Sequence, residues 1–173
     1  MSDERTLNLL GALALSLVDN LSLGIEASAG YGGETPAALV TLGTEPGLSI
    51  NSLRQILMLS HPGTVRLIDR LESQALVERR AGVDGRTLAL FLTEAGYERR
   101  STILAERRQQ LQRVIDPLTP NDLKQLTKLL EKMLTAMTTN ELRAFAICRL
   151  CDETVCSGDQ CPVEQKYCQM VKS

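Results

Sequence analysis

The chain has 173 residues, enough for one domain or for one domain with an oligomerisation extension. Aromatic residues make up 3% of it, tryptophan is absent and 43% of the residues are hydrophobic, which is typical of a helical core rich in leucine and alanine. The formal net charge of −2 argues against a coat protein that binds nucleic acid without specificity. This charge does not exclude binding to one specific nucleic-acid sequence.

The first predicted element is an apolar helix near the N-terminus. Apolar residues recur at helical spacing from Leu7 to Leu21 on most sides of this helix, so we expect it to be buried on more than one face. The run from Leu7 to Val18 does not follow a basic leader, and its twelve residues are fewer than the ~20 that cross a bilayer. We therefore expect a soluble, cytoplasmic protein without membrane contact.

The middle of the chain predicts a helix-turn-helix followed by a hairpin. A short helix begins at Thr35-Pro36, residues 45–48 form a turn, and residues 49–72 have apolar spacing for two helices that are split near Ser60. Residues 76–96 predict a strand, an Asp-Gly turn, a second strand and the start of a new helix. This order is that of a winged helix, which can hold duplex DNA with a helix and a hairpin.

Two longer helices are predicted after the hairpin. One runs from Gly96 to about Asp116, and the next opens at Thr119-Pro120 with an N-cap and a proline in its first turn. Apolar residues from Leu123 to Met137 then follow i, i+3, i+4, i+7 spacing. Such a stripe is commonly internal core, but the first and last helices carry more apolar surface than the small winged helix can cover. We therefore favour a dimer interface made from both ends of the chain.

The hairpin and the helix after it carry a family resemblance. Asp84-Gly85-Arg86 followed by Leu92-Thr93-Glu94-Ala95-Gly96 is similar to the D-x-R and L-T-x-x-G wing signature of the MarR family of bacterial transcriptional regulators. Residues 66–72 and 76–79 resemble that family's recognition helix and first wing strand. The resemblance implies a homodimer with intertwined terminal helices and a palindromic double-stranded DNA operator, usually bound to repress. It also implies that a small-molecule effector or an oxidant often releases the DNA.

The expected fold is mainly α, a winged helix-turn-helix with a two-stranded β-wing. We divide the chain into an N-terminal dimerisation helix at 1–34, a winged-helix DNA-binding domain at 35–100, C-terminal dimerisation helices at 101–147 and a cysteine-rich tail at 148–173. In this fold the start of the recognition helix and the tip of the wing face the DNA. The predicted DNA-binding residues are Ser60, His61, Gly63, Thr64, Arg66, Arg70, Asp84 and Arg86.

Arginine is the side chain suited to a bidentate contact with guanine, so Arg66 is the main candidate for base readout. Arg86 is expected to reach the adjacent minor groove, with Asp84 orienting it. A structural alternative stands beside this interpretation, because Arg66 and Arg70 are four residues apart and either could pair with an acid or a neighbouring helix. His61, the single histidine, is interpreted as a DNA contact or a cap and not as a catalytic base, so we do not expect an enzyme.

All five cysteines fall near the C-terminus. Four of them have gaps of two, four and four residues, a ladder that favours a metal site over a disulfide framework in a cytosolic protein. The proposed ligands are Cys148, Cys151, Cys156 and Cys161, with Cys168 in reserve. Zinc is the first choice on base rate, an iron-sulfur cluster is the alternative, and reversibly oxidised free thiols are a third interpretation. Because the tail is acidic, we expect it at the dimer end, away from the DNA.

The sequence thus predicts a dimeric DNA-binding regulator, in first place a repressor, whose affinity depends on a small ligand or on the metal or redox state of the cysteines. The alternative is a metal-handling or redox protein that uses the winged helix for protein contact. Phosphate contacts would distinguish the two, because they make DNA binding fall steeply as salt rises.

Overall fold

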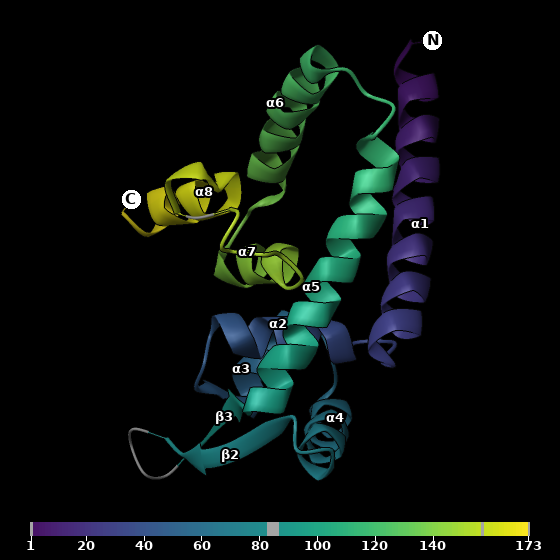
Figure 1. Cartoon of the computed structure of the whole chain (residues 1–173). Helices are drawn as coiled ribbons and strands as arrows, with labels where there is room; N and C mark the ends of the chain where they lie inside the picture. Colours follow the sequence, from purple (N-terminus) through teal and green to yellow (C-terminus); the bar gives the residue numbers. More distant parts are fainter. Residues whose placement is uncertain (1, 83–86, 157, 173) are drawn as a thin grey trace.

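The structure is a computed structural model that describes residues 2–82, 87–156 and 158–172. Within these residues the chain is mainly helical and carries one small antiparallel sheet, as the sequence predicts. Two long helices, α1 (Ser2–Ala29) and α5 (Glu94–Ile115), stand side by side above a winged-helix block, and the C-terminal helices lie to one side of them (Figure 1).

The winged-helix block begins with a helix whose second residue is a proline, at the predicted position. Ser49 and Ser60 set the starts of the next two helices, because each serine hydroxyl accepts a hydrogen bond from the backbone N–H three residues later. The elements of the block are α2 (Thr35–Thr44), β1 (Leu48–Ser49), α3 (Ile50–Ile56), α4 (His61–Ser73), β2 (Val77–Ala81) and β3 (Leu88–Leu92).

The sheet has three strands and not the two that the sequence predicts. The wing strands β2 and β3 pair antiparallel from Val77↔Leu92 to Ala81↔Leu88, and β1 adds to the other edge of β3 through Leu48↔Leu90. The sequence interpretation gave residues 45–48 to a turn because a two-residue strand has no detectable alternation. This third strand ties the start of α3 to the wing.

The long helices connect the winged-helix block to the far end of the molecule. α1 (Ser2–Ala29) packs along α5 (Glu94–Ile115), and α6 (Pro120–Met137) turns back from the top of α5 (Figure 1). Thr119 caps α6 as predicted, in a full capping box with Asp122, whose pKa is lowered by hydrogen bonds from the Thr119 hydroxyl and backbone. α5 is continuous from Glu94 to Ile115, so it crosses the domain boundary that the sequence analysis placed at residue 100.

The C-terminal segment folds into short helices. α7 (Glu141–Cys148) contacts α3 of the winged-helix block, and α8 (Pro162–Val171) packs on α7 and α6, after a 3-10 turn at Gly158–Gln160. The sequence interpretation grouped α7 with the dimerisation helices. In the structure this helix instead joins the cysteine segment to the winged-helix block.

Two apolar cores differ in size. The larger one fills the winged-helix block and includes Leu39, Leu53, Ile68 and Leu90, all fully buried. The smaller one lies between α7 and α8 around Ala144, Cys161 and Val163. The described residues of the cysteine segment therefore have little apolar core of their own.

α1 is far more exposed than its composition leads one to expect. Only Ile25 and Ala29 of its described side chains are buried, whereas Leu15 is 70% exposed. By length and composition the segment Asp3–Ala29 is also sufficient to cross a membrane, so the twelve-residue count made from the sequence underestimated this helix. Within one chain the predicted burial of α1 on several faces is absent among the described side chains.

Candidate functional site

The start of α4 is presented to solvent as a capped helix end. The Ser60 hydroxyl accepts a hydrogen bond from the Gly63 N–H at 3.2 Å, and both Ser60 and His61 are exposed. Gly63 is half-buried, and a Cβ at this position would lie 3.0 Å from the Ser60 hydroxyl oxygen. These three predicted contact residues therefore lie together at one accessible helix terminus.

Thr64 is a correction to the predicted DNA-binding set. Its side chain is fully buried and its hydroxyl donates to the Ser60 carbonyl oxygen at 3.1 Å. The spacing contained a signal for this, because Thr64 lies on the same helical stripe as the buried residues Leu67, Ile68 and Leu71. Thr64 stabilises the first turn of α4 from inside and is not exposed to a ligand.

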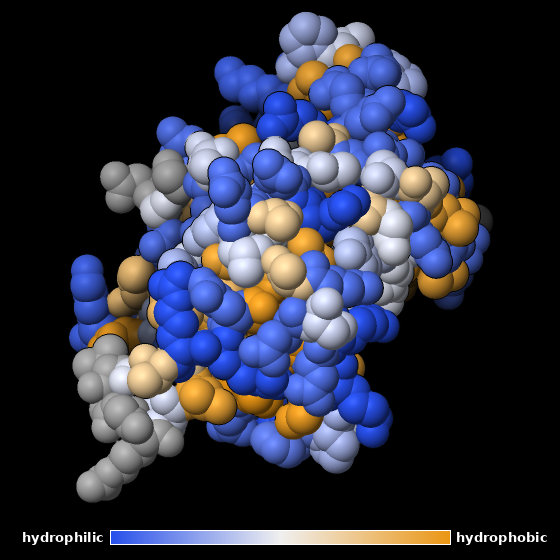
Figure 2. Space-filling model, turned by 60° about the horizontal axis from the view of Figure 1, so that its bottom comes forward, coloured by the Kyte–Doolittle hydropathy of each residue, from blue (hydrophilic) through white to orange (hydrophobic). Residues whose placement is uncertain are grey.

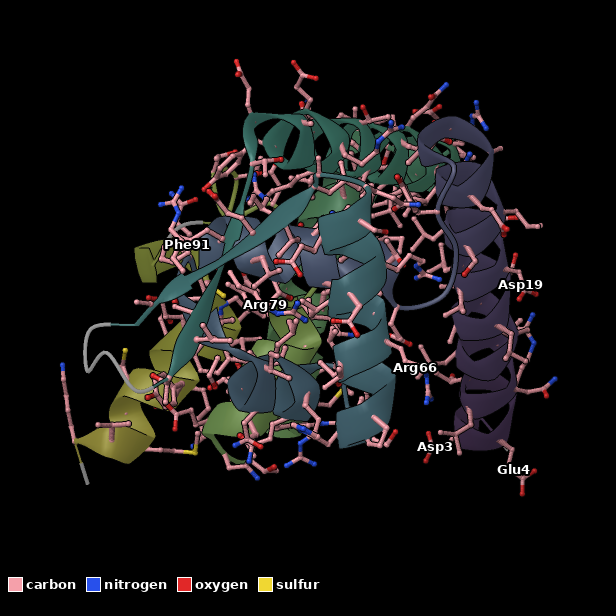
Figure 3. The ribbon with its side chains drawn as sticks, turned by 90° about the horizontal axis from the view of Figure 1, so that it is seen from below. Asp3, Glu4, Asp19, Arg66, Arg79 and Phe91 are labelled. Carbon is pink, nitrogen blue, oxygen red and sulfur yellow. The ribbon has the colours of Figure 1, made fainter. Side chains whose placement is uncertain are left out.

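Arg66 is placed as a ligand-binding side chain would be. It is exposed and projects sideways from α4 (Figure 3). Among the described residues, no hydrogen bond or ion pair occupies its guanidinium. Its charge is therefore available to a partner outside the chain.

Arg70, four residues further along α4, has a structural partner. One of its terminal nitrogens donates to the Thr35 hydroxyl at 2.6 Å, across to the start of α2. The structural alternative from the sequence, a bond to a neighbouring helix, is what the structure shows for this residue. Arg70 thus holds α2 and α4 together in the described state.

Arg79 joins the wing to α4. Its guanidinium makes an ion pair with Asp69 at 2.6 Å and a second one with Glu72, so a strand residue spans both acids of the helix. Arg79 is mostly buried, with 20% of its side chain exposed. The sequence interpretation, which identified residues 76–79 only as a wing strand, missed this bridge, because the contact depends on how β2 crosses α4.

The remaining wing residues are partly described. Arg80 pairs with Glu78 and stacks over the Phe91 ring, with 4.7 Å from the guanidinium carbon to the ring centroid. Asp84 and Arg86, the predicted minor-groove residues, lie outside the described residues. The end of the molecule that carries α4 and the wing is covered mainly by hydrophilic side chains, with smaller apolar patches between them (Figure 2).

The L-T-x-x-G part of the wing signature has a structural role. The Thr93 hydroxyl donates to the Ala75 carbonyl oxygen at 2.6 Å and accepts from the Gly96 N–H at 3.1 Å. A Cβ on Gly96 would lie only 2.1 Å from the Leu76 carbonyl oxygen. Glycine is therefore required where the first turn of α5 crosses the chain entering β2.

Four cysteines surround one cavity of about 410 Å³. Cys148 ends α7, Cys151 and Cys156 lie in the following loop, and Cys161 immediately precedes α8. All four line the cavity, whereas Cys168 is exposed on α8 and is not among the lining residues. The structure thus brings the four predicted ligands together and leaves the reserve cysteine outside.

The thiols of this cluster affect each other's ionisation. A hydrogen bond with Cys148 lowers the pKa of Cys151 to about 6, and the Arg107 charge acts in the same direction against the effect of burial. The same hydrogen bond raises the pKa of Cys148, while burial raises the pKa of Cys156 to about 11. Cys151 therefore ionises more readily than Cys148 or Cys156, which suits it to metal binding or oxidation.

The cysteine loop lies on the winged-helix block and not at the dimer end where the sequence interpretation placed it. The Arg149 carbonyl oxygen accepts a hydrogen bond from the Thr41 hydroxyl at 3.3 Å, and Leu150 packs against the large core. Asp152 approaches Arg108 of α5 at 3.6 Å, and its pKa is lowered chiefly by a hydrogen bond from Thr154. The acidic loop is attracted to the basic side of α5, a non-local contact that composition cannot predict.

A protein-family model matches the middle of the chain. The model described as the MarR family matches residues 30–87, which contain α2, β1, α3, α4 and β2. This match covers the helix-turn-helix, its exposed Arg66 and the wing strand that Arg79 anchors. Over these residues the chain is similar to the MarR family.

Solved structures agree with the fold. The chain is similar to YusO of Bacillus subtilis (21% identity, 79% of this chain and 99% of that one, TM-score 0.66) and to MepR of Staphylococcus aureus (19% identity, 74% and 95%, TM-score 0.64). It is also similar to the Mycobacterium tuberculosis MarR family protein Rv2887, solved in complex with salicylic acid (26% identity, 72% and 93%, TM-score 0.59). None of the curated proteins matches it. Each of these MarR-type structures is covered almost completely, while at least a fifth of this chain has no counterpart in them.

A second cavity, of about 360 Å³, lies between α1, the winged-helix block and the cysteine loop. Its apolar wall includes Leu21, Ile25 and Tyr31, and two cations, Arg107 and Arg149, also line it. The Arg99 guanidinium lies over the Tyr31 ring at 5.4 Å from the centroid and donates to the Ala29 carbonyl oxygen. The cavity thus combines an aromatic surface with two arginines and one carboxylate, that of Glu34.

Proposed function

We propose that this chain is a DNA-binding transcriptional regulator of the MarR family that acts as a homodimer on a palindromic operator, as a repressor. The observation that carries the proposal is Arg66, exposed and without a described internal partner at the start of a capped helix. The first turns of a recognition helix are the part that enters the major groove. Arg66 is therefore assigned to base readout and Ser60, His61 and Gly63 to phosphate or base contacts.

The ion pairs around α4 support this assignment electrostatically. Asp69 and Glu72 lie on the same helix as Arg66 and would repel phosphate if they were unpaired. Arg79 pairs with both acids from the wing strand and offsets part of their negative charge. The overall charge of −2 is thus compatible with DNA binding by α4, because the two acids of this helix are already paired with Arg79.

The homodimer is supported by exposed apolar side chains on two helices. α6 has none of its residues buried, although it carries the predicted stripe. A second copy would cover this stripe and the exposed leucines of α1, and it would account for the length and apolar character of α1 in a soluble cytoplasmic protein. The exposed large apolar residues are Leu7, Leu9, Leu10, Leu13, Leu15, Val18 and Leu23 of α1, with Leu129, Leu130, Met133 and Met137 of α6.

The second cavity supports a small-molecule effector. Its two arginines and aromatic surface fit an aromatic carboxylate, and a relative of this family was solved with salicylic acid. Because this cavity lies between α1, α2 and α5, a bound anion would change how the reading helix is held relative to the dimer helices. We expect salicylate to bind saturably in calorimetry and Arg107→Gln to weaken it at least fivefold, with Arg113→Ala as the control. Equal binding to both variants would place the effector elsewhere.

DNA binding is tested by selecting bound fragments from the organism's genomic DNA and measuring affinity at several salt concentrations. We expect Arg66→Ala to weaken binding by about 1–3 kcal/mol, roughly 5- to 150-fold. Arg113→Ala, a change of the same kind on the outer part of α5, is the matched control and should leave binding unchanged. Arg86→Ala is expected to weaken binding too, by the loss of the predicted minor-groove contact.

The salt dependence separates this function from the alternative. Each phosphate contact contributes about 0.9 to the slope of log affinity against log salt, so a dimer with several contacts has a steep slope. If neither the parent protein nor Arg113→Ala selects any fragment at low salt, the winged helix serves protein contact. We propose no catalytic role, because the single histidine is an exposed residue at a helix start.

A further inference from the structure

The cavity lined by the four cysteines has walls of two chemical kinds. Ala144, Phe145 and Val163 give it an apolar side, and Tyr167 closes it with a hydroxyl that donates to Glu141 at 2.8 Å. Glu45, Glu153 and Glu164 also line it. The carboxylates give this cavity an anionic wall, and the thiols beside them are metal ligands when they lose their protons, so the occupant that fits this space contains cations and is not an organic anion.

The arrangement of the thiols bears on whether that occupant is a single metal ion or a larger group. A single zinc ion with four thiolates at about 2.3 Å requires all four sulfurs to lie about 3.8 Å apart around one point. Among the described residues, no three histidine, cysteine or carboxylate side chains converge closely enough to hold one ion. Neighbouring thiols are hydrogen-bonded, Cys148 with Cys151 and Cys161, and Cys156 with Cys161. All four line a cavity of about 410 Å³, which is more space than one ion needs.

We propose that Cys148, Cys151, Cys156 and Cys161 bind an iron-sulfur cluster in this cavity. A cluster places several iron and sulfide ions beside four thiolates, so it needs a cavity next to its ligands that a single ion does not need. Its iron ions supply the positive charge that the anionic wall lacks. The apolar side limits access of water to the cluster. The geometry thus favours the cluster over zinc, the first choice from the sequence.

The same ligands are mechanically connected to the winged helix. Cys148 and Cys151 flank Arg149 and Leu150, the two residues that contact α2 and the large core. Cys151 also lines the second cavity, so one residue belongs to the walls of both. Cluster binding fixes Cys148 and Cys151, and it therefore fixes the contact between the cysteine loop and the winged-helix block.

A regulatory consequence follows, and it rests on the proposed function. The loop holds α2 and α5 in one arrangement only while its two anchoring cysteines are fixed, so the cluster-bound and cluster-free proteins differ in how the reading helix is supported. We expect the two forms to differ at least fivefold in operator affinity, the lower end of the range for coupled sites. Cys168 takes no part, because it is exposed and does not line the cavity.

The first experiment measures iron, acid-labile sulfide and zinc in full-length protein purified without oxygen, together with its visible absorption. We expect iron and sulfide in the parent and in Cys168→Ser, and their loss in Cys156→Ser with an unchanged circular dichroism spectrum and oligomeric state. One zinc per chain without sulfide would overturn the cluster, and so would metal-free protein that takes up no iron and sulfide on anaerobic reconstitution. Full cluster content in Cys156→Ser would overturn the ligand set.

The second experiment measures operator affinity of the parent protein before and after removal of iron by a chelator, and after reconstitution with ferrous iron and sulfide. A reversible change of at least fivefold in the parent and in Cys168→Ser, absent in Cys156→Ser, supports the regulation. Equal affinity of both forms overturns it. If no form binds DNA, the proposed function fails, whereas the iron and sulfide content still decides the cluster.

Discussion

The winged-helix block and helix α6 use the same apolar periodicity and reach opposite degrees of burial. In α4 the stripe that contains Leu67, Ile68 and Leu71 is buried inside the block. In α6 a stripe of equal regularity leaves Leu130 44% exposed and none of its residues buried. Periodicity therefore identifies which face of a helix is apolar, and it does not identify what covers that face.

The largest expected effect comes from a charge in the exposed stripe. Leu130→Glu should separate the dimer, because burial of one leucine contributes about 1.5–3 kcal/mol and two-fold symmetry counts the loss twice, about 3–6 kcal/mol in all. Light scattering over a range of concentrations measures this. Lys128→Glu on the same helix is the control and should stay dimeric. A Leu130→Glu protein that remains a dimer at low concentration would remove α6 from the interface.

A smaller effect is expected from truncation inside the block. Ile68→Ala should lower the free energy of unfolding by about 2–5 kcal/mol, because Ile68 is fully buried and its removal leaves a cavity. Urea denaturation measures the change. The truncation should shift the midpoint equally at all protein concentrations if it acts within one chain. A shift that depends on concentration would mean that the block is not stable without its partner.

The smallest effect concerns the start of α6. Thr119→Ala removes the hydroxyl that accepts from the Asp122 N–H and should cost about 1 kcal/mol of stability. The Asp122 pKa, lowered by the Thr119 hydrogen bonds, should then rise toward its ordinary value. The cap contributes to the free energy of unfolding at pH values above the pKa of Asp122 in the unfolded chain. This contribution is lost as pH falls through the lower pKa of Asp122 in the folded chain. Carboxyl titration by NMR would detect it, and an unchanged Asp122 titration would show that the cap does not act as described.

The local signals of the sequence predicted much of the fold. Thr119 was identified as a helix start by its residue type and by the proline that follows, and it caps α6. The split predicted near Ser60 is where this serine caps α4. The hairpin was visible from its Asp-Gly turn and apolar strands. These features depend on residues within one or two turns of each other, so neighbouring sequence determines them.

Contacts between distant segments were the part that the sequence could not predict. Arg79 is a strand residue that bonds to two acids of α4, and Arg70 bonds to Thr35 at the start of α2. Thr64 was misassigned because its polar side chain outweighed its place on the buried stripe. The cysteine loop was misplaced because its charge was weighed against DNA and not against Arg108. Each of these depends on how packed elements cross.

The unbroken α5 gives the molecule a lever. Its 22 residues span about 33 Å, from the turn where Gly96 touches the Leu76 carbonyl oxygen to the end nearest α6. Because the first turn of α5 packs closely on the chain that enters β2, we expect the winged-helix block to move together with α5. A tilt of about 10° at the far end would therefore carry the reading head about 6 Å sideways, as far as a minor groove is wide. In the proposed dimer, a small tilt of α5 where the two copies meet would thus displace α4 far enough to change its fit to the DNA grooves.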